Sequence, residues 1–168
     1  NRIRNKSFWI VDVLKNGYIK KQFNEVKFGI GNPNSETAKH TKDLHIKSLL
    51  EHAIKTTPYY KRLGGVQNIS DFPVIRKTTI QDNFEAFQSN EYKDKSNFKV
   101  STSGSTGVPF FLFQNKGKRH RNHADNIYFF DKSGFQVGDR LYELEVWRGH
   151  NQKGKLKSWL QNAVQFDI

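Results

Sequence analysis

The sequence predicts an α/β fold in which helices pack on a partial mixed sheet. Apolar residues recur with the 3.6-residue helical period in several segments, and short strand-like runs lie between those segments. A tract of Gly, Ser and Thr separates two of the runs. The 168-residue chain has 35% hydrophobic residues but 14 Phe, so aromatic side chains supply much of the apolar area of a core. We therefore expect one folded domain and not a disordered chain.

The first 60 residues are predicted to be a helical lead-in to an α/β part over 61–168. Residues 6–15 indicate a short helix that Asn16-Gly17 ends. A second helix over 18–28 would turn three apolar side chains inward, namely Ile19, Phe23 and Val26. The Gly, Asn, Pro and Ser residues of 29–35 then predict a loop.

A longer helix is predicted from about Ser35 to Thr56. Five apolar residues at helical spacing form one face of it: Ile46, Leu49, Leu50, Ala53 and Ile54. Pro58 ends the helix, because the residue before a proline avoids the helical conformation. Tyr59 and Tyr60 follow, and they either pack at this helix end, which we favour, or line a pocket for an acyl group.

The α/β part begins with an extended segment over 72–75. Thr78 and Gln81 have the spacing of a capping box, so we expect them to open a helix that continues through Ile80, Phe84 and Phe87. The remaining elements are predicted in order as strands over 98–101 and 109–113, a helix over 116–132, a strand over 141–147 and a helix over 152–164.

The formal net charge of +12 has two interpretations: an anionic partner (a nucleic acid, an anionic membrane or an anionic ligand), or an acidic remainder that is missing from this chain. The chain carries no recognised nucleic-acid-binding motif, so a small basic nucleic-acid-binding domain is only the alternative. With no Cys, a disulfide framework and a Cys-based metal site are excluded. The apolar runs are too short for a membrane span, and we expect a cytoplasmic protein.

Three clusters have a structural and a functional interpretation, and we favour the structural one in each case. Glu143 and Glu145 share a strand face, where they serve as acid and base or only meet solvent. His45 and His52 share a helix edge, but a metal site would need a third ligand. The densest basic run either contacts an anion or forms a solvated helix face: Lys116, Lys118, Arg119, His120, Arg121 and His123.

The Gly/Ser/Thr tract lies in the sequence VSTSGSTGVPF, between the first two predicted strands. Glycine permits backbone torsions that direct successive N–H groups at one point, and Ser and Thr hydroxyls add donors. Together they suit phosphate oxygens. The tract is not a P-loop, because no Lys follows Gly107 and a strand comes next. Linkers have a similar composition, but the flanking strands favour the phosphate-binding interpretation.

The motif TSGSTGVP resembles the phosphate loop of the adenylate-forming superfamily, which includes the acyl-coenzyme A synthetases. Two preceding stretches, LLEHAIKTTPYYKRLGG and DFPVIRKTTIQDNFEAF, resemble phenylacetate–coenzyme A ligases and their capsular-polysaccharide-biosynthesis relatives. The opening FWIVDVLKNGYIKKQFNEVK is more similar to the capsule-biosynthesis branch. The resemblance covers about Phe8 to Trp147.

The resemblance implies the N-terminal portion of the large domain of an ATP-dependent ligase. In that family a carboxylate attacks the α-phosphate of ATP, and the acyl-adenylate then passes its acyl group to coenzyme A or another acceptor. The carboxylate and the acceptor cannot be read from this sequence. The loop would bind the β- and γ-phosphates, with Mg²⁺ sharing their charge, through six residues: Thr102, Ser103, Gly104, Ser105, Thr106 and Gly107.

Two departures from the family pattern limit what the resemblance implies. Val108 and Phe110 stand where many members carry a lysine. The family's adenine, ribose and magnesium motifs and its late catalytic Lys lie downstream, and the chain ends at Ile168 before any of them. We therefore expect an N-terminal fragment over 1–168 that does not adenylate a carboxylate alone, and we assign no catalytic residue.

Two further expectations follow from an incomplete domain. A truncated sheet exposes an edge and an apolar face, so we expect that the chain can form a homodimer. A third interpretation is an interaction domain that has lost catalysis and keeps only the shell of the enzyme.

Overall fold

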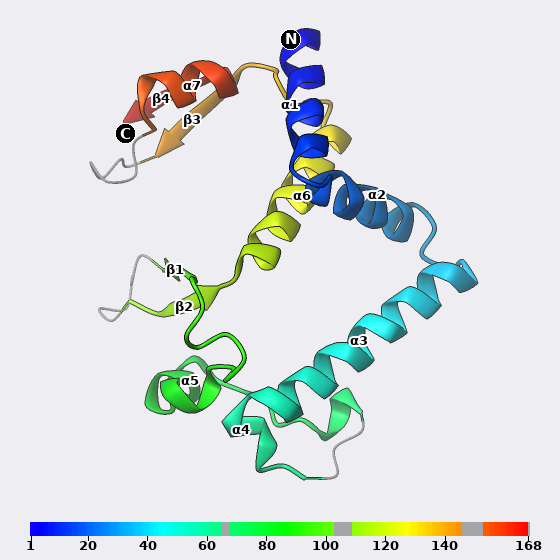
Figure 1. Cartoon of the computed structure of the whole chain (residues 1–168), viewed down its shortest axis with the longest axis vertical. Helices are drawn as coiled ribbons and strands as arrows, with labels where there is room; N and C mark the ends of the chain where they lie inside the picture. Colours follow the sequence, from blue (N-terminus) through cyan, green and yellow to red (C-terminus); the bar gives the residue numbers. More distant parts are fainter. Residues whose placement is uncertain (65–67, 103–108, 146–152, 168) are drawn as a thin grey trace. The chain divides into compact units, whose positions relative to one another are not determined.

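The computed structural model describes residues 1–64, 68–102, 109–145 and 153–167. The predicted mixture of helices and strands is confirmed, but the described strands do not form one mixed sheet. They form two separate pairs, one antiparallel and one parallel (Figure 1). Contacts group the chain into two units, one of Asn1–Phe28 with His120–Ile168 and one of Gly29–Arg119. The residues of the predicted helical lead-in are therefore shared between both units.

Helices α1 (Arg2–Leu14) and α2 (Tyr18–Gly31) are joined by the predicted turn. Asn16 and Gly17 both have positive φ, at 72° and 62°, which ends α1 as expected. The buried carboxylate of Asp12 accepts hydrogen bonds from the backbone N–H groups of Ile19 and Lys20, at 3.1 and 2.8 Å. This carboxylate caps the first turn of α2. Helix α2 runs on to Gly31, so the predicted start of the loop at residue 29 was too early.

The main apolar cluster of the first unit joins α2 to α6 (Lys116–Lys132), whose bounds match the prediction. Its buried members are Phe23, Val26, Ala124 and Tyr128. Trp9, Ile19 and Ile127 pack against them. The predicted inward direction of Phe23 and Val26 is confirmed. The four-residue spacing from Ala124 to Tyr128 places both on the same face of α6.

Arg121 forms a half-buried ionic network beside this cluster. Its guanidinium donates to Glu25 at 2.6 Å and to Asp125 at 3.0 Å. Burial acts against the charge of Arg121, but the hydrogen bonds to Glu25 and Asp125 outweigh it and raise the pKa of Arg121. In the same basic run, His120 stacks on Tyr18 with ring centroids 5.7 Å apart. These two members therefore have packing partners and do not form a merely solvated face.

The parallel pair consists of β3 (Leu141–Glu145) and β4 (Ala163–Asp167), connected by α7 (Lys155–Gln161) (Figure 1). The helix predicted over 152–164 was too long. Asn162 adopts a left-handed conformation with φ of 52°, and the chain then turns into β4. The alternation of apolar and polar residues over 164–167 (VQFD) is the strand signal that the sequence interpretation missed.

The second unit begins with α3 (Glu36–Thr56) and the one-turn helix α4 (Pro58–Lys61). Ser35 caps α3, because its hydroxyl oxygen accepts from the Ala38 N–H at 3.2 Å. The apolar face predicted for α3 is only partly covered. The helix has no fully buried residue, and Leu49 is 65% exposed.

The next segment contains η1 (Ile69–Asp71), α5 (Lys77–Asp82) and η2 (Phe84–Phe87). The capping box predicted at Thr78 and Gln81 was wrong, since α5 begins at Lys77 with Arg76 as its N-cap. A capping box is present instead in η1, between Asn68 and Asp71. The sequence rule failed here because it tests spacing alone, whereas the extended residue at the start of the helix is Arg76 and Thr78 already lies inside α5.

Tyr59 and Tyr60 pack at the end of α3, as the favoured interpretation predicts. The Tyr59 ring stacks on Phe87 at 3.9 Å between centroids, and Tyr60 meets Phe72 edge-on at 5.3 Å. Burial, with the nearby Tyr59, raises the pKa of the Tyr60 hydroxyl. Within the part of the chain that the structure describes, none of the helices combines the length and the apolar character that crossing a bilayer requires.

Candidate functional site

The antiparallel hairpin of β1 (Phe98–Ser101) and β2 (Phe111–Gln114) carries the predicted phosphate loop (Figure 1). The bounds of β1 match the prediction, whereas β2 starts two residues after the predicted Pro109. In the register, Phe98 faces Gln114 and Ser101 faces Phe111. The last residue of β1 is therefore paired with the first residue of β2, and the Gly/Ser/Thr tract lies between them in the sequence.

Thr102 closes the base of the loop with its backbone and its side chain. Its N–H donates to the Phe110 carbonyl at 2.8 Å, and its Oγ1 accepts from the Phe110 N–H at 3.2 Å. A hydroxyl that accepts a hydrogen bond still holds a proton to donate. Thr102 can therefore brace the hairpin and offer its hydroxyl proton to an anion. Thr102 is exposed, as a ligand-facing position requires.

The other predicted phosphate ligands, Ser103, Gly104, Ser105, Thr106 and Gly107, lie outside the described residues. Their assignment stays a prediction from the sequence.

Three cations lie over aromatic rings of the hairpin. Lys99 Nζ is 4.1 Å from the centroid of Phe111, and Arg119 Cζ is 4.2 Å from that of Phe98. Lys77 Nζ is 5.7 Å from the ring of Phe110, the residue that bonds to Thr102. Such cation–aromatic contacts position a charge without neutralising it. Lys77 was not predicted at this site, because it belongs to α5 and only the fold brings it to Phe110.

Aromatic side chains anchor the hairpin on η2. Phe84 lies 4.6 Å from Phe111 and 6.0 Å from Phe113, measured between ring centroids. These two hairpin residues point to the same side of the pair, because side chains alternate along a strand. The hairpin that carries the loop therefore packs against η2 through these aromatic rings.

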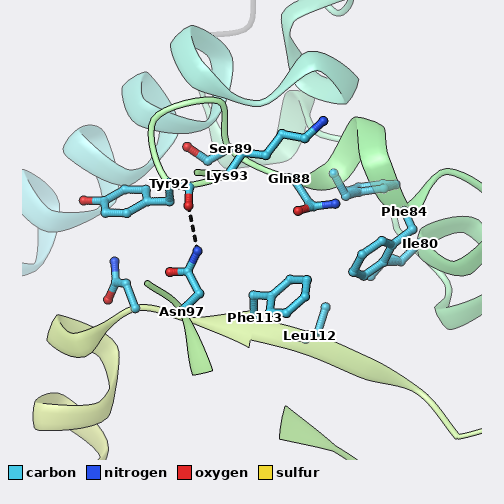
Figure 2. Close-up of a pocket in the computed structure, with 11 residues that line it drawn as sticks. Ile80, Phe84, Gln88, Ser89, Tyr92, Lys93, Asn97, Leu112 and Phe113 are labelled. Carbon is cyan, nitrogen blue, oxygen red and sulfur yellow. Dashed lines mark hydrogen bonds between the residues drawn. The ribbon is translucent and has the colours of Figure 1, made fainter. Parts of the chain in front are cut away.

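A pocket of about 240 Å³ lies beside this support (Figure 2). In Figure 2, Phe113 and Leu112 come from β2 and form one wall, while Ile80 and Phe84 form the apolar end. The opposite wall is the segment that follows η2, where the Asn97 amide donates to the Tyr92 carbonyl at 2.6 Å. The full lining is Ile80, Phe84, Phe87, Gln88, Ser89, Tyr92, Lys93, Asn97, Leu112, Phe113 and Asn115. Apolar side chains thus meet amide and hydroxyl groups in one small space.

Two other candidates, Glu143 and His52, have structural partners. Glu143 pairs with Lys153 and also accepts from the Gln165 amide at 3.4 Å, so it is not one of two free carboxylates on a sheet face. The segment Trp147-Arg148-Gly149, at the end of the predicted strand over 141–147, is a weak candidate for a substrate or nucleotide loop and lies outside the described residues. The described residues hold no cluster of three or more His, Asp or Glu side chains able to bind a metal. His52 instead joins a polar network at the end of α3.

Comparison with protein-family models, with curated proteins and with solved structures finds no match to this chain. The functional interpretation therefore depends on the residues and their arrangement.

Proposed function

We propose that the β1–β2 hairpin presents residues 102–107 to the β- and γ-phosphates of ATP, within a carboxylate-activating, acyl-adenylate-forming ligase. The ligase would be of the phenylacetate–coenzyme A ligase or capsule-biosynthesis type. The observation that carries the proposal is the closure of the Gly/Ser/Thr tract by paired strands and by the two Thr102–Phe110 hydrogen bonds. A linker of the same composition would need no such closure.

Closure of the hairpin favours anion binding for an energetic reason. A free Gly/Ser/Thr segment would have to lose backbone freedom when its N–H groups converge on a phosphate. Strand pairing up to Thr102 and Phe110 holds both ends of the tract, so part of that ordering is already present before a ligand binds. The donors that remain are the tract's backbone N–H groups and hydroxyls.

The charge around the hairpin supports the same function. Lys77, Lys99 and Arg119 all lie on the hairpin's aromatic rings, and the whole chain carries a formal net charge of +12. A polyphosphate approaching the loop meets a positive potential that speeds association and falls with added salt. In this proposal Lys77 supplies the cation that many relatives of the resembled family carry within the loop.

The proposal assigns binding and positioning to this chain, and no chemical step. Mg²⁺ would reach the site mainly as a complex with the phosphate oxygens of ATP, since it retains several waters and needs few protein ligands. The carboxylate would be activated at the α-phosphate. Its identity and that of the acyl acceptor are left open.

Thermal unfolding in the presence of Mg-ATP tests the proposal. At 100 times the dissociation constant, a ligand bound to the folded state alone adds about 2.7 kcal/mol of stability, which raises the melting temperature by several degrees. We expect this shift with Mg-ATP, a smaller one with AMP, and none in the Ser103→Ala/Ser105→Ala/Thr106→Ala variant. Lys77→Ala should weaken binding about tenfold while Lys157→Ala, an exposed lysine of α7, should not.

Two results would contradict the proposal. One is equal stabilisation of the wild-type chain and the triple variant by Mg-ATP. The other is binding of DNA or RNA with a steep dependence on salt while Mg-ATP has no effect, which would support the nucleic-acid alternative.

A further inference from the structure

A chain of polar contacts runs from Ser89, on the wall of the pocket, to Glu91. Ser89 Oγ donates to Thr56 Oγ1 at 2.9 Å, and Thr56 Oγ1 lies 3.2 Å from His52 Nε2. On the other side of the imidazole, His52 Nδ1 is 3.5 Å from Glu91 Oε2. Ser89 Oγ itself is 3.5 Å from His52 Nε2. Two hydroxyls, an imidazole and a carboxylate thus follow one another in order.

The backbone fixes the members of this chain. His52 and Thr56 lie one helical turn apart at the end of α3, so their side chains share a face. The segment after η2 is held against that end, because the Asn90 N–H donates to the Thr56 carbonyl at 2.8 Å. Residues on either side of Asn90, Ser89 and Glu91, are therefore brought to the two ring nitrogens of His52.

The order of the groups determines where protons can move. The carboxylate beside Nδ1 favours the tautomer with hydrogen on Nδ1, which leaves Nε2 free to accept. Thr56 Oγ1 accepts a hydrogen bond from the Ser89 hydroxyl. The hydroxyl proton of Thr56 has two acceptors within reach, the His52 carbonyl at 2.8 Å and His52 Nε2 at 3.2 Å. A serine hydroxyl becomes a nucleophile when a base accepts its proton and a third group orients that base.

We propose that Ser89 is a nucleophile, activated by His52 through Thr56 and oriented by Glu91, for acyl transfer from activated esters with a short apolar acyl group. The pocket that Ser89 lines has apolar walls from Phe84 and Phe113 and a volume of about 240 Å³, which suits a short acyl chain (Figure 2). Ser89 lines this pocket while its hydroxyl donates to Thr56 Oγ1 on α3 at 2.9 Å. The inference is independent of the phosphate loop.

The reaction balances with water as the only co-reactant. Ser89 Oγ attacks the ester carbonyl and forms a C–O bond, while its proton passes through Thr56 to His52 Nε2. The bond from the carbonyl carbon to the leaving oxygen breaks, and His52 returns the proton to that oxygen to release an alcohol. Water then attacks the acyl-Ser89 ester with His52 as base, which releases a carboxylic acid and restores the hydroxyl.

Labelling with diisopropyl fluorophosphate tests this assignment in the whole chain. The reagent forms an Oγ–P bond with loss of fluoride only at an activated hydroxyl, and peptide mass spectrometry locates the adduct. We expect the adduct on Ser89, none at that position in Ser89→Ala, and p-nitrophenyl butyrate hydrolysis that is lost in Ser89→Ala. His52→Ala should slow labelling by about 100-fold, the loss expected for a general base. Added imidazole should restore part of the rate in that variant.

Matched variants separate activation from structure. His40→Gln removes an exposed imidazole from the same helix and should leave labelling unchanged. Thr56→Ser keeps the relaying hydroxyl and should label normally, whereas Thr56→Val should label slowly with the same circular dichroism. Glu91→Gln should slow labelling, and Glu91→Asp should retain more of the rate. The proposal is overturned if Ser89 carries no adduct, or if labelling of a folded His52→Ala variant slows less than tenfold.

Discussion

The two strand pairs of this protein differ in how far other side chains cover their apolar faces. In the β1–β2 hairpin, Phe111 and Phe113 both pack on Phe84 of η2. The β3–β4 pair has a buried Ala163, but on the alternate face Leu144 is 61% exposed and Phe166 is 47% exposed. Parallel strands are normally covered on both faces. An antiparallel pair can be stable with one face covered, whereas this parallel pair leaves apolar area open.

The exposed face of the β3–β4 pair, which carries Leu144 and Phe166, is the surface where we expect a contact with a second copy of the chain. Tyr142 and Phe166 stack across the two strands at 6.1 Å and stay largely in solvent. The homodimer expected from the sequence stays a prediction. Light scattering of the wild-type chain and of a Leu144→Lys variant tests whether this face forms the dimer contact.

The largest expected effect of a single change falls on the supported pair. Phe84→Ala removes the ring that contacts both Phe111 and Phe113, and we expect it to lower the free energy of unfolding by about 3 kcal/mol. Urea denaturation measures the change. Phe129→Ala, which truncates a ring that is 57% exposed, is the control and should cost under about 1 kcal/mol. Equal losses in the two variants would show that η2 does not support the hairpin.

A smaller loss of stability is expected in the parallel pair. Its ion pair, Lys153–Glu143, is less exposed than the Arg121 pairs. Side-chain exposure is 22% for Lys153 and 18% for Glu143, and Lys153→Ala leaves the carboxylate with the Gln165 amide as its remaining partner among the described residues. We expect a loss of about 2 kcal/mol, below the cost of breaking a fully buried pair. Thermal unfolding compared with Lys157→Ala measures it. If the two lysine variants unfold alike, the ion pair adds nothing to the sheet.

The smallest effect concerns the base of the loop. Thr102→Val keeps the shape of the side chain but removes the oxygen that accepts from the Phe110 N–H. Because both residues are near solvent, we expect about 1 kcal/mol of local destabilisation, equal to about fivefold faster amide hydrogen exchange at Phe110. Thr102→Ser retains the acceptor and should exchange at the wild-type rate. Unchanged exchange in Thr102→Val would mean that backbone pairing alone closes the hairpin.

Local sequence patterns determined most element positions. The spans of β1 and α6, the turn at Asn16-Gly17 and the inward side of Phe23 followed from alternation, helical period and glycine, which act over a few residues. The Gly/Ser/Thr tract was recognised for the same reason. Its position between two strands was correctly predicted, whereas its role as a phosphate ligand stays a prediction.

Long-range contacts decided what these patterns could not. Pairing of β3 with β4 in parallel, the approach of Lys77 to Phe110, and the meeting of His52 with Ser89 and Glu91 all join residues far apart in the chain. No local period encodes such contacts, because they depend on which apolar surfaces bury one another. The sequence by itself therefore determined α6, the approximate spans of the N-terminal helices, the hairpin and the candidate phosphate ligands. Only the tertiary structure decided which cations lie over the aromatic rings of the hairpin and which polar groups meet at the pocket, since packing sets those distances.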